Sequence, residues 1–196
     1  MNIYTYNIMV ASSILPVALH RGKIYFLFGK ENEMEDSAKG FSDFGGRVET
    51  GESIMETAFR EGSEELCGFL GDEDSIKCML KRGGIYKVVH NDYHVHIFVM
   101  EYDENLPKYF TNHHRFLWDR MDKDMLNDSK YFEKQELKWF SVTEMKTKKH
   151  LFRGFYQEIV DHFLSQMKKI TAFVNQRKNT RGKACSMKKT RRVKGG

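Results

Sequence analysis

Three glutamates, Glu61, Glu64 and Glu65, stand close together in the first third of the chain. On a helix, spacings of three and four residues place their carboxylates on one face within a single turn. Like charges at this spacing repel one another, and the negative end of the helix dipole adds to the cost. A divalent cation would remove the conflict, since Mg²⁺ prefers hard oxygen ligands and is often shared with substrate phosphates. The triplet therefore indicates either a metal site suited to water attack on a phosphoanhydride or, as is common for such triplets, a solvated helix surface.

The residues around the triplet carry the signals of a helix from Ile54 to Cys67. Ser53 is a good N-cap, and Glu56 three residues later completes a capping box. Gly68 is a natural stop for the helix. The apolar side of this helix should dock on the core and leave the carboxylates facing a groove; it comprises Met55, Ala58, Phe59, Gly62 and Leu66.

Residues 46–68 resemble the Nudix box, Gly-x5-Glu-x7-Arg-Glu-U-x-Glu-Glu-x-Gly-U, in which U is a bulky apolar residue. The fixed positions matched in register are Gly46, Glu52, Arg60, Glu61, Glu64 and Glu65. Two positions depart from the pattern. Gly62 replaces the usual apolar residue, at a cost of ~1 kcal/mol in a helix, so we expect close packing against it. Cys67 stands at the usual glycine position and Gly68 follows, so we expect the helix to end one residue late.

The resemblance implies an enzyme that cuts a nucleoside diphosphate linked to another group, by water attack on phosphorus, with Mg²⁺ or Mn²⁺ as cofactor. It implies metal ligands from the second half of the box, together with the backbone carbonyl of the residue before its glycine. In this sequence these ligands are Gly45, Glu61, Glu64 and Glu65. The resemblance further implies that Arg60 orients a catalytic glutamate and that Glu52 supports the same network.

Many proteins of this family use one more glutamate from outside the box as a base or an extra ligand. It often lies shortly before a strand that Trp139-Phe140-Ser141 resembles, so Glu133 and Glu136 are the candidates. Each could equally be an ordinary surface charge. The resemblance extends more diffusely over about residues 5–170. Two segments, 65–71 and 102–110, look similar to Nudix proteins of large eukaryote-infecting DNA viruses.

Strand and helix patterns alternate along the chain. The order of strands, helix, strands and helix predicts an α/β (α+β) fold, a mixed sheet between helices, which is the arrangement that the family resemblance also implies. A helix with loops is expected in an insertion at 103–135. The expected strands and final helix are a hairpin of Ile14–His20 and Lys23–Phe28, an extended segment Phe41–Val48, strands Gly84–His90, His94–Tyr102 and Glu136–Val142, and a long amphipathic helix Phe152–Val174.

The charge is distributed unevenly over the 196 residues. The net charge is +5, but residues 175–196 hold nine basic residues and no acidic one, which leaves −4 for residues 1–174. We expect one domain over 1–174 and a tail that is disordered in isolation. Basic residues from Arg177 to Lys194 could contact RNA or DNA, act as a nuclear-import signal, or only aid solubility.

Three functions remain open from the sequence. The first is a hydrolase of small nucleoside diphosphate derivatives, the second is an mRNA-decapping enzyme that binds RNA through the tail, and the third is a catalytically silent Nudix fold that only binds. The absence of an apolar run of membrane length and of a secretory signal predicts a cytoplasmic protein, or a nuclear one through the tail. Loops 29–40 and 103–135 are expected to decide the substrate.

Overall fold

The sheet is built on a long antiparallel hairpin. The computed structural model describes residues 10–32, 39–122, 124–125 and 132–178. Strands β1 (Ala11–His20) and β2 (Lys23–Glu31) are joined by Arg21 and Gly22, which have φ angles of 48° and 77°. Positive φ at both central residues is the geometry of a type I′ turn, whose twist matches that of paired strands. The predicted hairpin is confirmed.

The two strands of the hairpin diverge away from their turn. They pair with each other only at Val17–His20 and Lys23–Phe26. In the resulting fork, β3 (Phe41–Ser42) pairs with the far end of β2, and β4 (Phe44–Arg47) pairs with the start of β1. The segment predicted as extended, Phe41–Val48, is thus two short strands inside the fork, and it brings Gly45 and Gly46 against β1.

Three more strands complete the sheet. Strand β6 (Tyr93–Val99) runs parallel to β1, β5 (Ile85–His90) is antiparallel to β6, and β7 (Lys134–Ser141) is antiparallel to β2. One parallel pair among antiparallel neighbours makes the sheet mixed, as predicted.

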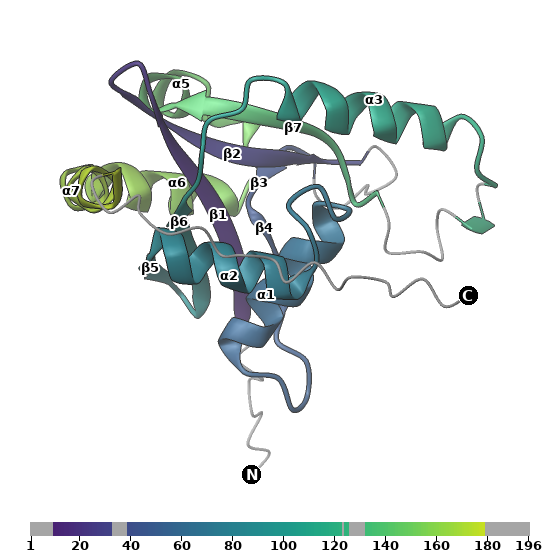
Figure 1. Cartoon of the computed structure of the whole chain (residues 1–196), viewed down its shortest axis with the longest axis horizontal. Coiled ribbons are helices and arrows are strands. Elements are labelled where there is room, and N and C mark those ends of the chain that lie inside the picture. Colours follow the sequence, from purple (N-terminus) through teal and green to yellow (C-terminus); the bar gives the residue numbers. More distant parts are fainter. Residues whose placement is uncertain (1–9, 33–38, 123, 126–131, 179–196) are drawn as a thin grey trace, which may run out of the picture.

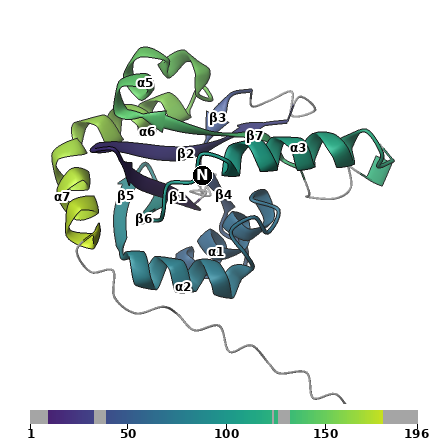
Figure 2. The same ribbon diagram turned by 45° about the horizontal axis from the view of Figure 1, so that its top comes forward.

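Helices cover both faces of this sheet, so the predicted fold class is confirmed. Residues of β1 alternate between two apolar cores: Leu15 and Val17 enter one, and Ile14 and Ala18 enter the other. Figure 2 shows α1 and α2 on one side of the strands and α5 and α6 on the other. The helices are α1 (Ile54–Glu65), α2 (Glu73–Gly83), α3 (Leu106–Trp118), α5 (Val142–Thr147), α6 (Tyr156–Ser165) and α7 (Met167–Lys178), with a short 3₁₀ turn at Lys149–Leu151.

Helix α3 is the helix expected in the insertion at 103–135. It lies along β7 and projects beyond the sheet (Figure 1). Helix α2 was not predicted. Its N-cap is Asp72, whose side chain accepts a hydrogen bond of 2.9 Å from the Ser75 amide, and only Ile76 and Leu80 are fully buried on it.

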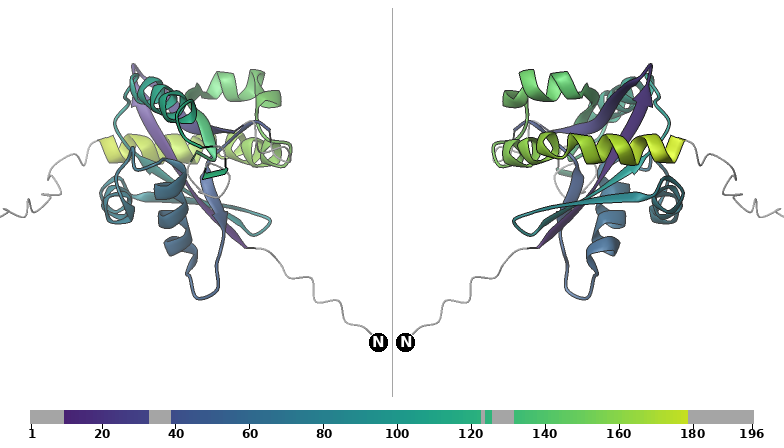
Figure 3. Two further views of the ribbon diagram at one scale, coloured as in Figure 1. Left: turned by 90° about the vertical axis from the view of Figure 1, so that its right-hand side faces the viewer. Right: turned by 90° about the vertical axis from the view of Figure 1, so that its left-hand side faces the viewer.

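The prediction of one long helix over Phe152–Val174 is wrong. The segment forms α6 and α7, which follow one another along the same side of the sheet (Figure 3). The chain breaks at Gln166, whose carbonyl accepts the first hydrogen bonds of α7 from Lys169 and Ile170. The apolar period gave no sign of the break because residues before and after it enter the same core.

The C-terminal boundary also differs from the prediction. Helix α7 continues to Lys178, so the predicted division between residues 174 and 175 falls inside it. The rest of the basic tail, 179–196, lies outside the described residues. None of the helices in the described part of the chain has the length and apolar character needed to cross a bilayer.

Candidate active site

Helix α1 begins as its sequence predicts. The Ser53 side chain accepts a hydrogen bond of 3.3 Å from the Glu56 amide, and the Glu56 carboxylate accepts one of 2.8 Å from the Ser53 amide. This capping box fixes where the helix starts. It thereby sets the rotation of α1, and with it the directions in which the carboxylates farther along the helix point.

Arg60 gathers the carboxylates of this region. Its guanidinium holds Glu52 with two hydrogen bonds, 2.7 Å from Nε and 3.1 Å from Nη2. Nη1 lies 2.9 Å from Glu61 and 3.2 Å from Glu64. The hydrogen bonds from Arg60 and then from Thr57 lower the pKa of Glu52 to about 2. A guanidinium is suited to this arrangement because its planar fork presents several donors at once.

Gly46 leaves room for the Glu61 carboxylate. A Cβ atom at Gly46 would stand 2.4 Å from Oε1 of Glu61. Gly45 has a different reason to be glycine, since a Cβ there would stand 2.2 Å from Cβ of Ser13 on β1. The glycine pair therefore lets β4 approach β1 and lets Glu61 lie against β4.

Glu65 differs in its surroundings from the other two glutamates of the triplet. It is 4% exposed, whereas the Glu64 side chain is 36% exposed. One oxygen of Glu65 accepts a hydrogen bond of 2.8 Å from the Gly45 amide, and the other lies 3.2 Å from Nζ of Lys134. The expectation that all three carboxylates face an open groove is therefore wrong for Glu65, which turns toward the sheet.

A second group of buried charges surrounds Lys134, which is 1% exposed. Its ammonium contacts Glu31 and Glu65 and donates a hydrogen bond of 2.9 Å to Ser42. Arg153 contacts the same oxygen of Glu31, Oε1, at 2.8 Å. This group was not predicted from the sequence because its members are distant in the chain, and a lysine or glutamate at a strand end gives no sign of burial.

The pKa shifts of Lys134 and Glu65 show which ionised forms this group stabilises. Burial alone would lower the pKa of Lys134, but the carboxylates of Glu65 and Glu31 outweigh it and raise the pKa. Burial raises the pKa of Glu65 well above its ordinary value, against the effect of Lys134, and the charges of Glu31 and Glu133 raise it further. The ammonium is thus firmly charged, whereas burial opposes the ionisation of Glu65.

The two glutamates proposed from outside the box lie in different places. Glu133 directly precedes β7 and is near enough to Glu65 to raise its pKa. Glu136 lies farther along β7, where it lines a pocket with Thr111 and His114 of α3. Glu133 therefore lies next in the chain to Lys134 of the buried group, and Glu136 lies in a separate pocket.

The two departures from the box have structural explanations. A Cβ at Gly62 would stand 2.3 Å from Cδ1 of Ile14, so the expected close packing at this glycine is confirmed. The expectation of a helix that ends one residue late is wrong. The Cys67 amide donates to the Glu64 carbonyl and the Gly68 amide donates to the Ser63 carbonyl, which is a Schellman motif with Cys67 in the left-handed position at φ 48°. Cys67 thus ends the helix where glycine usually does.

The donor set of this region suits a hard divalent cation. Among the described residues, no three acidic, histidine or cysteine side chains are already arranged around one cation position. The charge balance nevertheless favours binding of a cation, because three basic side chains, Arg60, Lys134 and Arg153, are shared among six carboxylates. Carboxylate oxygens are also the ligands that Mg²⁺ and Mn²⁺ prefer. These carboxylates are Glu31, Glu49, Glu52, Glu61, Glu64 and Glu65.

An open cleft lies beside Glu61. It has a volume of about 720 Å³ and is lined by Arg47, Val48, Glu49, Thr50 and Glu61. The segment that forms its wall is the loop between β4 and α1, which also carries Glu52. A ligand in this cleft would therefore meet the Glu61 carboxylate and a guanidinium on the same side.

No protein-family model matches the sequence, and no curated protein matches it. The chain is similar to solved structures of Nudix proteins. A C. elegans Ap4A hydrolase is 14% identical over 85% of this chain and 98% of that chain, with a TM-score of 0.46. A mutT/nudix family protein from Listeria innocua is 15% identical over 84% and 96%, with a TM-score of 0.44. The Nudix domain of Shewanella oneidensis NrtR, in complex with ADP ribose, is 9% identical over 83% and 88%, with a TM-score of 0.41.

Proposed function

We propose that the protein is a Nudix-type hydrolase that cleaves a diphosphate linkage in a nucleoside diphosphate derivative, with Mg²⁺ or Mn²⁺ bound at α1. The observation that carries the proposal is the assembly in which Arg60 holds Glu52, Glu61 and Glu64 together beside an open polar cleft. A solvated helix surface, the alternative interpretation of the glutamates, does not require one guanidinium to hold three carboxylates.

Each side chain has a distinct part in this proposal. Glu61 and Glu64 are the ligands nearest to solvent, with Glu65 and the backbone of Gly45 behind them. Arg60 and Glu52 position these carboxylates, and Glu133 is the base that takes a proton from the attacking water. The chemistry that a bound divalent cation supplies is neutralisation of charge on the diphosphate and a lower pKa for water. Glu136, in its separate pocket, is no longer favoured as the base.

The test is hydrolysis of a substrate panel by the full chain, with Mg²⁺ and with Mn²⁺. The panel contains nucleotides, dinucleoside polyphosphates, nucleotide sugars and capped RNA. The variant Glu64→Gln should lower the rate on the best substrate by roughly 10²–10³-fold, because several kcal/mol of charge stabilisation is lost. Glu158→Gln is the matched control, since Glu158 is an exposed glutamate on α6 whose carboxylate faces His90, and it should leave the rate unchanged.

The outcome separates the candidate functions. Hydrolysis of small derivatives that is abolished in Glu64→Gln supports the proposal, and cleavage confined to capped RNA supports the decapping alternative. If the parent protein cuts nothing in the panel with either metal, the proposed enzymatic function is excluded and the interpretation as a binding module remains. Deletion of residues 179–196 should leave hydrolysis of small substrates intact. A weaker affinity for RNA with a smaller salt dependence in that deletion would give the tail a nucleic-acid role.

A further inference from the structure

The ion pairs of the candidate site fall into two groups with different net charges. In the outer group, Arg60 is paired with four carboxylates, which leaves a net charge of −3. In the inner group, two carboxylates are paired with two basic side chains, so the charges balance. The carboxylates of the outer group are Glu49, Glu52, Glu61 and Glu64, and the inner group consists of Glu31, Glu65, Lys134 and Arg153.

The ammonium of Lys134 lies among oxygen atoms of the inner group. It contacts Oε1 of Glu31, lies 3.2 Å from Oε1 of Glu65 and donates a hydrogen bond of 2.9 Å to the Ser42 hydroxyl. Both carboxylates are almost completely buried, at 5% and 4% exposure. Two carboxylates from different elements and a hydroxyl are the kind of oxygen donors that a hard divalent cation takes. The ammonium thus occupies a position between two buried carboxylates that a cation could otherwise fill.

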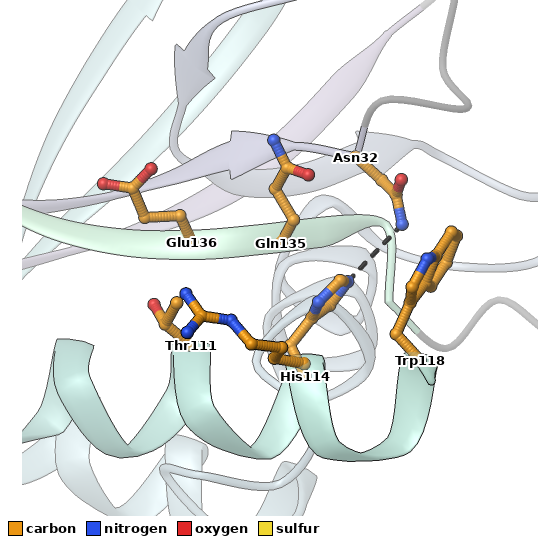
Figure 4. A pocket seen from close by; sticks show the side chains of 7 residues that line it. Asn32, Thr111, His114, Trp118, Gln135 and Glu136 are labelled. Carbon is orange, nitrogen blue, oxygen red and sulfur yellow. Dashed lines mark hydrogen bonds between the residues drawn. The ribbon is translucent and has the colours of Figure 1, made fainter. Parts of the chain in front are cut away.

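Lys134 is fixed in this position by its surroundings. Its stem passes over Gly29, where a Cβ would stand 2.9 Å from the Cγ and Cδ atoms of the lysine. Beside it, the Asn32 amide donates a hydrogen bond of 2.8 Å to the Glu133 carbonyl, which joins the ends of the two strands. Figure 4 shows the Asn32 side chain reaching from the end of β2 toward His114 of α3, at 3.5 Å. The lysine therefore cannot swing out to make room for a metal ion.

The two groups differ in what a divalent cation would do to their charge. In the outer group it would reduce the net charge from −3 to −1. In the inner group it would place two positive charges on a buried set that is already balanced, and uncompensated charge in a buried position is costly. Even with Glu133, whose charge acts on Glu65, the inner group has a net charge of only −1. One cation at the outer group is therefore favoured, and a second at the inner group is not.

We propose that Lys134 takes the place of a second metal ion, so that the protein binds one divalent cation, at Glu61 and Glu64 with Glu65 behind them. The inference rests on the proposed hydrolase function and adds to it the number of cations that the site holds. Lys134 is a positioning residue in this arrangement, since it holds Glu65 and Glu31 and takes no part in the chemistry of the substrate.

The test is a titration of the full chain with Mn²⁺, followed by electron paramagnetic resonance. The six-line signal of free Mn²⁺ falls when the ion is bound, so the titration counts bound ions without any substrate. The parent protein should bind one Mn²⁺ per chain. Lys134→Met leaves Glu31 and Glu65 with Arg153 alone, a net charge of −1, and should bind a second Mn²⁺. In Glu31→Gln/Lys134→Met the balance is restored, so the count should return to one.

Lys148→Met is the control for the loss of a lysine. Lys148 is 42% exposed on α5 and pairs with Glu144 at 2.9 Å, so the variant also frees a carboxylate, but one that water solvates. It should bind one Mn²⁺, as the parent does. Two ions of comparable affinity in the parent protein would overturn the proposal, and so would a count of one in Lys134→Met.

A variant that does not fold without metal also gives a decision. A ligand that binds only the folded state stabilises it. Mn²⁺ should therefore restore the circular dichroism spectrum of an unfolded Lys134→Met variant, or raise the melting temperature of a folded one more than that of the parent. A variant that Mn²⁺ neither refolds nor stabilises beyond the parent would contradict the idea that a cation can replace the ammonium.

The count separates this inference from the proposed function. If the parent protein binds two ions and hydrolyses a substrate in the panel, the hydrolase stands and the role of Lys134 fails. If the parent binds no Mn²⁺ and cuts nothing, the hydrolase fails. The role of Lys134 is then decided by its variant alone, since a single Mn²⁺ gained in Lys134→Met supports it and no gain refutes it.

Discussion

Replacing Lys134 by methionine removes the central charge of the buried group while keeping much of the side chain. The stem of Lys134 passes over Gly29, where a Cβ would stand 2.9 Å from its Cγ and Cδ atoms. Methionine can fill the same path, so packing is largely preserved. The ammonium contacts of Lys134 with Glu31, Ser42 and Glu65 are lost. Removing one partner of a buried ion pair costs about 3–5 kcal/mol, because the remaining charges stay buried without compensation.

That loss is large against a total stability of about 5–15 kcal/mol for a domain. The assay is urea unfolding of the metal-free protein, followed by circular dichroism. The control is Lys148→Met: Lys148 is 42% exposed and pairs with Glu144 one helical turn away at 2.9 Å, so the loss should be below about 1 kcal/mol. The double variant Glu31→Gln/Lys134→Met should lose less than the sum of the two single variants, because one uncompensated charge is gone.

A small loss of stability in Lys134→Met would refute the role of its ammonium in this group. If Lys134→Met and Lys148→Met lower the free energy of unfolding equally, the ammonium of Lys134 is not holding buried carboxylates. Additive losses in the double variant would show that Glu31 and Lys134 do not interact in solution.

Two further predictions concern glycines of the box. Gly46→Ala places a methyl group against the Glu61 carboxylate and should lower hydrolysis at least tenfold with little loss of stability, whereas Gly154→Ala, where a Cβ would meet nothing within 4 Å, should change neither. A clear fall in the melting temperature of Gly46→Ala would argue against the first prediction, because the lower rate would then reflect loss of folded protein. Gly62→Ala should destabilise by about 1–3 kcal/mol in urea unfolding, because crowding of Ile14 outweighs the gain in helix propensity. Ile14→Val removes the crowded Cδ1 atom, so the double variant should lose less than the sum of the singles, and strict additivity would contradict this explanation.

Local signals predicted the elements that depend on few residues. The turn between His20 and Lys23 and the capping box of Ser53 and Glu56 depend on residues close in the chain, and both were found where the sequence placed them. The break at Gln166 was missed because it is defined by backbone hydrogen bonds and not by a change in apolar period. Helix α2 was missed because its two fully buried residues make too short a pattern.

Apart from Glu133, which came from the family resemblance as one of two candidates, the members of the candidate site that were predicted are close together in the chain. Glu52 and Arg60 are eight positions apart on consecutive segments, and the structure joins them with two hydrogen bonds. Lys134 and Arg153 reach Glu31 across more than a hundred residues, and only the pairing of β2 with β7 brings Lys134 and Glu31 together. No property of either residue type announces such a partner, since lysine and glutamate are mostly exposed.

The burial of Glu65 changes which carboxylates a metal ion can reach first. Two protein groups, the Gly45 amide and the Lys134 ammonium, already bind the oxygens of Glu65. Arg60 contacts Glu61 and Glu64 through Nη1, and their side chains are 13% and 36% exposed, against 4% for Glu65. A cation that enters from solvent therefore meets Glu64 and Glu61 before Glu65. The three glutamates are equivalent in the sequence pattern but not in the folded chain, because the fork of the sheet places a strand amide and a buried lysine against one of them.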